Sequence, residues 1–336
     1  MAPMMDWTDR HCRYFLRGFN PHVQLYTEMI VADAILRGDA NRLLRFNAAE
    51  HPLALQLGGS DPARLAAAAR IGVQFGYDEI NLNCGCPSDR VHAGAFGACL
   101  MREPGRVSQC VAAMRAAVQV PITVKMRIGV LEGGAQLRER VQGFDADDRE
   151  ALHGFVAGIA AAGCSRIIVH ARKAVLGGLS PAENREVPPL RYDVVRDLKT
   201  AFPKLALELN GGLREVQEIV AALDWCDGVM LGREAYHRPY LLFELLQVED
   251  GGAARPAESE LLLRMARYAE SELAAGERLS AVVRHMLGLY AQRPGAREFR
   301  RQLAEGARDP RADAGLLHEA AERAARMDAA SAAGDR

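Results

Sequence analysis

Polar and charged side chains stand at the ends of six successive short apolar runs. An amide, a cysteine-bearing loop, a lysine, a histidine and two glycine-rich turns are found there: Gln56, 81–87, 125–127, 170–172, 210–212 and 232–233. An ammonium group such as that of Lys125 balances the charge of an anionic ring or an enolate, and amide or imidazole groups hydrogen-bond the polar edge of a planar cofactor. These residue types together predict a site for such a cofactor. Alone, His170 would be interpreted as an ordinary strand-end histidine.

The cysteine in the sequence 85–87 (Gly-Cys-Pro) is the candidate for proton transfer or nucleophilic chemistry. Cys86 follows an apolar run, so its thiol can reach the same end of the sheet. Cys84 and Cys99 are expected to pack inside the fold. The spacing of Cys84, Cys86, His92 and Cys99 matches no zinc motif, so no metal site is predicted.

Two glycine-rich turns predict a phosphate site. Gly211 and Gly212 follow one apolar run, and Gly232 with Arg233 follows the next. Glycine turns expose backbone N–H groups, and barrel enzymes commonly hold phosphate after their last two strands. The alternative is that these glycines serve the turns alone.

The elements that would position these groups form a repeat of strands and helices. Seven strands are predicted at 23–26, 53–57, 79–83, 122–126, 166–170, 205–210 and 228–231, and an eighth at 1–5. Helices are predicted at 62–75, behind Ser60 and Asp61 as caps, and at 107–118. This alternation predicts an α/β fold, a (β/α)8 TIM barrel. A doubly wound open sheet is the alternative, but its glycine fingerprint is absent.

The repeat is predicted to occupy residues 1–247 as the catalytic domain, with a truncated first strand. A polar linker with glycine and proline follows at 248–256, and the helical periodicity of 257–327 predicts a small all-helical C-terminal domain. Residues 328–336 are expected to form a flexible tail. The polar segment 130–148 is longer than a barrel needs and is either a lid or an insertion.

Composition bounds the class of protein. The chain has 336 residues, is 49% hydrophobic and carries a net charge of -1. Its hydrophobic content excludes a mainly disordered chain, and its net charge gives no indication of nucleic-acid binding. Seven cysteines, an odd number, stand without a secretory leader and are expected to be reduced. No apolar run reaches the ~18 residues of a membrane span, so a cytoplasmic protein is expected.

Several motifs resemble those of one enzyme family over nearly the whole chain. They are 2–9 (APMMDWTD), 25–29 (LYTEM), 79–88 (EINLNCGCPS), 97–101 (GACLM), 184–186 (NRE) and 227–233 (DGVMLGR). They are similar to the A subfamily of the tRNA-dihydrouridine synthases. The resemblance implies an FMN-binding barrel that reduces the C5=C6 bond of D-loop uridine, at positions 20 and 20a, to 5,6-dihydrouridine, with NADPH as electron donor.

The resemblance also implies roles for individual residues. Hydride would pass from N5 of the flavin to C6 of the uracil, and Cys86 would be the general acid that protonates C5. FMN would be bound by Pro3, Met4, Met5, Gln56, Lys125, His170, Asn210, Gly211, Gly212, Gly232 and Arg233. Contacts to tRNA are expected from Asn83, Arg90, Asn184, Arg185, Arg297, Arg300 and Arg301. A monomer is expected.

The helical domain is expected to hold the tRNA. The stretch 281–310 contains six arginines against three acidic residues, and Arg297, Arg300 and Arg301 share one helix face at i, i+3 and i+4. A solvated charged face is the alternative explanation.

Two other functions stay open. A flavin-barrel ene-reductase acting on a free pyrimidine would not need the C-terminal arginines. A tRNA-binding protein without catalysis would bind tRNA without flavin and would not need Cys86.

Overall fold

The computed structural model describes residues 1–88, 96–134, 137–291 and 295–334. The chain forms two compact units. The barrel unit comprises Met1–Met5, Gln24–Phe46 and His51–Gly232, and the helical unit comprises Asp6–Val23, Asn47–Glu50 and Arg233–Arg336.

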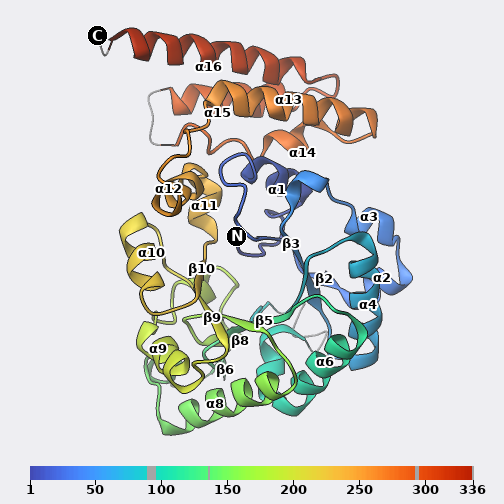
Figure 1. Cartoon of the computed structure of the whole chain (residues 1–336), viewed down its shortest axis with the longest axis vertical. Coiled ribbons are helices and arrows are strands. Elements are labelled where there is room, and N and C mark those ends of the chain that lie inside the picture. The colour runs from blue at the N-terminus through green and yellow to red at the C-terminus, as the bar shows by residue number, and fades with distance from the viewer. Residues whose placement is uncertain (89–95, 135–136, 292–294, 335–336) are drawn as a thin grey trace. The chain divides into compact units, whose positions relative to one another are not determined.

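The barrel unit is built on a curled sheet whose paired strands are all parallel. Its order is β1 (Leu25–Tyr26), β3 (Leu53–Gly58), β4 (Glu79–Cys84), β5 (Ile122–Arg127), β7 (Arg166–His170), β9 (Ala206–Asn210) and β10 (Gly228–Met230). The short strand β2 (Ile30–Val31) also pairs with β3. Helices alternate with the strands and surround them (Figure 1). The predicted (β/α)8 barrel is confirmed, and all seven predicted strand segments are present within two residues of their expected limits.

The first residues of the chain lie between the two outer strands of this sheet. The amino group of Met1 donates to the carbonyl oxygen of Gln24 at 2.7 Å, just before β1. The backbone N–H of Ala2 donates to the carbonyl oxygen of Leu231 at 2.6 Å, just after β10. The segment predicted as an eighth strand therefore bridges both edges, although it forms no strand of its own.

The barrel unit contains the helices α2 (Ala32–Arg37), α3 (Ala40–Leu44), α4 (Pro62–Phe75), α6 (Pro104–Ala117), α7 (Leu137–Gln142), α8 (Ala146–Ala161), α9 (Tyr192–Ala201) and α10 (Val216–Leu223). Several of them begin at a side-chain cap. The Asp61 side chain accepts from the N–H of Arg64 and caps α4, and Pro62 occupies its first turn. The helix predicted at 62–75 is confirmed, and the one predicted at 107–118 begins three residues earlier.

The segment 130–148 is ordered where the structure describes it. It contains β6 (Val130–Glu132), which pairs with β8 (Ala174–Leu176), then α7 and the first turn of α8. The buried Lys173 ammonium anchors it, donating to the Asp148 carboxylate at 2.6 Å and to the Arg140 carbonyl at 3.2 Å. The choice between a lid and an insertion stays open.

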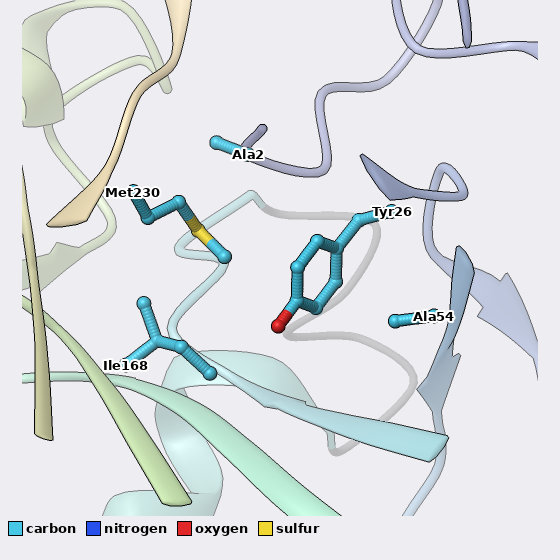
Figure 2. Close-up of a cluster of buried hydrophobic side chains, with 5 residues drawn as sticks. All are labelled: Ala2, Tyr26, Ala54, Ile168 and Met230. Carbon is cyan, nitrogen blue, oxygen red and sulfur yellow. The ribbon is translucent and has the colours of Figure 1, made fainter. Parts of the chain in front are cut away.

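An apolar cluster lies inside the barrel unit. Figure 2 shows side chains from separate segments gathered around one tyrosine ring: Ala2, Tyr26, Ala54, Ile168 and Met230. All five are at most 6% exposed, and Met4 packs against them. Burial of this cluster holds the N-terminal segment against the strands.

The helical unit contains α1 (Arg10–Leu16), α11 (Arg233–His237), α12 (Tyr240–Glu249), α13 (Glu258–Ala274), α14 (Leu279–Val283), α15 (Ala296–Gly306) and α16 (Gly315–Gly334). No strand occurs among its described residues, which confirms an all-helical C-terminal region. Helix α16 continues through most of the stretch predicted as a tail from 328. No helix in the described part of the chain is long and apolar enough to cross a membrane.

An N-terminal stretch, residues 6–23, also belongs to the helical unit. Asp9 pairs with the buried His285 at 2.9 Å, and the ring of Tyr14 stacks on that of Tyr268 with centroids 4.1 Å apart. These partners lie more than 250 residues away in sequence, so local periodicity could not reveal them. The predicted division into a catalytic domain that ends at 247 and a tRNA-binding domain that begins at 257 remains a prediction.

Candidate active site

The strand register brings the predicted polar residues of the barrel unit to one end of its sheet. Asn83 pairs with Lys125 across β4 and β5. Arg127 pairs with His170, and His170 pairs with Asn210 on the next strand. Because neighbouring parallel strands end at the same edge, these groups surround one mouth.

The loop that carries Cys86 is held by Asn83. The side-chain oxygen of Asn83 accepts the backbone N–H groups of Gly85 at 3.1 Å and Cys86 at 3.0 Å. The carbonyl oxygen of Cys86 accepts from Ala98 N–H at 2.9 Å. Its thiol is partly exposed and lies 3.5 Å from Ser88 Oγ. Of the seven cysteines, only Cys86 and Cys99 are not buried, so Cys86 is the thiol available to chemistry at this mouth.

Lys125 gains or loses its positive charge near neutral pH. Its ammonium donates to the Asn210 side-chain oxygen at 3.0 Å, and the Asn210 amide nitrogen donates to the Met230 carbonyl at 2.6 Å. Burial, together with the nearby positive charge of Arg127, lowers the pKa of Lys125 to about 7. Asn210 therefore fixes the direction in which the lysine points.

His170 is neutral and packs against a turn that requires glycine. Burial, then the positive charges of Arg127 and Lys125, hold the pKa of His170 well below its ordinary value. At Gly211, φ is +108°, and a Cβ atom would lie 2.4 Å from His170 Cδ2. At Gly212, φ is +79°, and a Cβ atom would lie 2.3 Å from Leu190 Cδ1. Both positions thus exclude a side chain.

Arg127 is a site residue that the sequence analysis left without a role. It is 4% exposed, and its guanidinium donates to the carbonyl oxygens of Gly85 at 3.2 Å and Asn184 at 3.0 Å. It therefore ties the Cys86 loop to the loop before Arg185. Burial lowers the pKa of Arg127 to about 9. Its place two residues after Lys125, on the same strand face, was the available signal.

The expected tRNA contact at Asn184 needs correction. Asn184 is fully buried; its amide oxygen accepts from Val175 N–H at 2.7 Å, and its amide nitrogen donates to the Val175 carbonyl at 2.9 Å and the Leu179 carbonyl at 3.1 Å. A buried amide engaged at both ends cannot reach RNA, so Asn184 shapes the loop that carries Arg185. The expected contact at Arg90 lies outside the described residues.

Gln56 is also occupied within the barrel unit. It is 1% exposed, its oxygen accepts from Asn83 and its amide nitrogen donates to Asn81. At the N-terminus, Pro3 and Met4 are partly buried, whereas Met5 is 59% exposed. Met4 Sδ lies 3.6 Å from where a Cβ atom of Gly232 would stand. The FMN contacts expected of these residues remain predictions.

Arg185 lies in the barrel unit, whereas Arg233 and the three arginines predicted at 297–301 belong to the helical unit. Arg233 is the first residue of α11. On α15, Arg297, Arg300 and Arg301 are all exposed. Arg301 is paired within its own helix, at 2.7 Å to Glu298 and 3.3 Å to Glu305. Part of this face is therefore already neutralised.

Comparison with known proteins identifies the family. A family model described as "Dihydrouridine synthase (Dus)" matches residues 1–326. The chain belongs to the dihydrouridine synthase family. The resemblance inferred from the motifs is confirmed at this level, and the family is one of oxidoreductases with a barrel fold.

Curated relatives in this family cover most of the chain. A "tRNA-dihydrouridine(20/20a) synthase" of Xanthomonas campestris is 53% identical over 323 residues, which is 96% of this chain and 92% of that protein. Proteins with the same name from Synechocystis and Vibrio cholerae are 51% and 48% identical. They cover 91% and 95% of this chain, and 88% and 94% of those proteins.

Proposed function

We propose that this member of the dihydrouridine synthase family is a flavin-dependent tRNA-dihydrouridine synthase. It would reduce the C5=C6 bond of the D-loop uridines at positions 20 and 20a, with NADPH as electron donor. The names of its relatives support the substrate and the positions. The observation that carries the proposal is the partly exposed Cys86 thiol, which is held by Asn83 at the same barrel end as Lys125.

The residues at this end suit FMN. The turns at Gly211 and Gly212 have backbone conformations that glycine tolerates best, and such turns offer N–H groups to a phosphate. Lys125 would lie beside the polar edge of the ring, and the neutral His170 would donate or accept a hydrogen bond there. Bound at this end, FMN would supply the hydride for C6 of the uracil.

The chain's own residues would complete the reduction. Cys86 would act as general acid, its S–H bond breaking as a C–H bond forms at C5. Lys125 and Arg127, both cationic when protonated, would stabilise the negative charge that develops on the C4 oxygen. Asn83, expected from the sequence to contact tRNA, has its amide oxygen held by the Cys86 loop and its nitrogen by Gln56, so it would position the thiol and not touch the base. A uridine stacked in folded tRNA must first leave its stack, at a cost of a few kcal/mol.

The test begins with an absorbance spectrum of the purified protein, then an assay for dihydrouridine after mixing with NADPH and unmodified tRNA. Flavin bands and dihydrouridine at positions 20 and 20a are expected. Cys86→Ala should keep flavin and tRNA binding but lose about 100-fold or more in single-turnover rate, since a positioned acid contributes that much. Cys99→Ala is the matched control and should remain active.

Three results would contradict the proposal. Unchanged turnover in Cys86→Ala would remove the acid role. Reduction of free uridine but not of tRNA would favour an ene-reductase. Binding of tRNA by a protein without flavin, unaffected by Cys86→Ala, would favour a binding protein without catalysis.

A further inference from the structure

A chain of side-chain hydrogen bonds runs along the inside of the barrel unit, starting at the residue that holds the Cys86 loop. Asn83 Nδ2 donates to Gln56 Oε1 at 2.8 Å, and Gln56 Nε2 donates to Asn81 Oδ1 at 2.7 Å. Asn81 Nδ2 donates to Thr123 Oγ1 at 2.8 Å, and the Thr123 hydroxyl donates to Glu79 Oε1 at 2.5 Å. All five residues are at most 8% exposed. We call this chain the polar relay.

The relay ends on a carboxylate at the opposite end of the strands. Glu79 and Arg166 are the first residues of β4 and β7, whereas Cys86 follows the last residue of β4. Glu79 Oε1 also accepts from the Tyr26 hydroxyl at 2.9 Å, and Glu79 Oε2 pairs with Arg166. Arg166 in turn pairs with Glu208 at 3.1 Å. Both carboxylate oxygens of Glu79 therefore accept hydrogen bonds, Oε1 from two hydroxyls and Oε2 from the guanidinium of Arg166.

The acceptor at one end dictates every direction along the relay. Because Glu79 Oε1 accepts, the Thr123 hydroxyl donates to it and accepts from an amide N–H. Asn81 therefore turns its nitrogen to Thr123 and its oxygen to Gln56. The same reasoning leaves the Gln56 oxygen to accept from the nitrogen of Asn83.

The Cys86 loop, at the other end of the relay, independently requires the same orientation of the Asn83 amide. The backbone N–H groups of Gly85 and Cys86 can only donate, so they need the oxygen of the Asn83 amide. A half-turn of that amide would face its NH2 group with two N–H donors on one side and present its oxygen to the Gln56 oxygen on the other. In the turned amide, each of these two contacts would leave buried polar groups without a hydrogen-bond partner, which is unfavourable.

We propose that Thr123 and Glu79 are positioning residues for Cys86. Through the relay they fix the amide of Asn83, which sets the backbone of the loop and thereby the place from which the thiol delivers its proton. The functional part of this inference rests on the proposed role of Cys86 as general acid. Thr123 lies two residues before Lys125 on β5 and contacts neither Cys86 nor its loop in the described hydrogen bonds, so its effect on the thiol would pass through the relay.

The test replaces the Thr123 hydroxyl while keeping its shape. Thr123→Val removes the two relay hydrogen bonds, and Thr123→Ser restores the hydroxyl. Thr27→Val is the matched control for loss of a buried threonine hydroxyl. Thr27 is similarly buried and its hydroxyl makes two hydrogen bonds, with the backbone N–H of Gln56 and the Glu28 carbonyl, so its removal leaves every side-chain hydrogen bond of the relay in place.

Two readouts are measured on each purified variant. The first is kcat and KM for dihydrouridine formation in tRNA. The second is the rate at which iodoacetamide alkylates Cys86, followed by mass spectrometry of the peptide, which does not depend on turnover. For Thr123→Val we expect kcat to fall about tenfold with KM within about twofold, and alkylation to rise about threefold, as for loss of one hydrogen bond that orders the loop. Thr123→Ser and Thr27→Val should stay close to the parent protein in both.

The outcomes separate this inference from the proposed function. If Thr123→Val matches Thr27→Val in kcat and in alkylation while Cys86→Ala is inactive, the relay has no positioning role and the acid assignment stands. If Cys86→Ala is active, the acid assignment fails and so does the functional part of this inference, and the alkylation rates still decide whether Thr123 orders the loop. If Thr123→Val does not fold, Thr123→Cys, close in volume and a weak hydrogen-bonding partner, takes its place in both measurements.

Discussion

Replacing Gly211 with alanine tests whether the turn after β9 and the ring of His170 form one packed unit. An alanine Cβ would stand 2.4 Å from His170 Cδ2 and 2.8 Å from His170 Nε2, at a φ of +108°. The positive φ costs about 1–2 kcal/mol for a residue with a Cβ, and forcing a methyl group into a packed site costs about 1–3 kcal/mol. Gly211→Ala should therefore lower the free energy of unfolding by about 2–5 kcal/mol.

The assay is urea unfolding followed by circular dichroism, with Gly105→Ala as control. Gly105 is the second residue of α6, and a Cβ atom at that position would have nothing within 4 Å, so its replacement should be neutral or stabilising by up to about 1 kcal/mol. The His170 ring must also move in Gly211→Ala, and we expect flavin affinity to fall with it. An unfolding free energy equal to that of the parent protein would refute the packing argument. Equal losses in Gly211→Ala and Gly105→Ala would show that the loss is not specific to this turn.

Two further predictions concern Lys125 and Asn184. The pKa of Lys125 is about 7 in the folded chain, against an ordinary value of 10.5. Between these two pH values the unfolded chain binds a proton that the folded chain has released. The free energy of unfolding should therefore rise with pH, by up to about 1.4 kcal/mol per pH unit. Urea unfolding between about pH 7 and about pH 9 should show that rise relative to Lys125→Met, and parallel curves would contradict the lowered pKa. Asn184→Ala leaves the N–H and carbonyl of the buried Val175 without their side-chain partner and should cost about 1–3 kcal/mol by thermal unfolding. Arg185→Ala, on the same loop, should instead weaken tRNA binding with little loss of stability, and a reversal of the two effects would contradict our correction of Asn184.

Much of the barrel is determined by local pattern. The burial of each strand and the spacing of apolar residues in the helices are properties of short windows, so segments such as β4 and α4 could be predicted with nearly their final bounds. Strand ends also predict the site, because parallel strands present their carboxyl ends at one edge. Lys125, His170 and Asn210 accordingly meet there.

Long-range pairing was not visible in such windows. Residues 6–23 fall within the stretch predicted as barrel, yet they pack in the helical unit because Asp9 and Tyr14 find partners more than 250 residues away. The ion pairs of Arg301 are, by contrast, local: Glu298 and Glu305 stand at i−3 and i+4, so the helical spacing that predicted a tRNA contact also places these partners beside it.

The barrel, its order of strands and the family could all be inferred from the sequence, since they follow from periodicity, strand ends and contiguous motifs. Three-dimensional packing was needed to show that Asn184 is buried, that Arg127 joins two loops, and that Thr123 and Glu79 connect to the Cys86 loop. The difference arises because a hydrogen bond depends on the distance and direction between two atoms. For residues tens of positions apart in the chain, folding alone sets both.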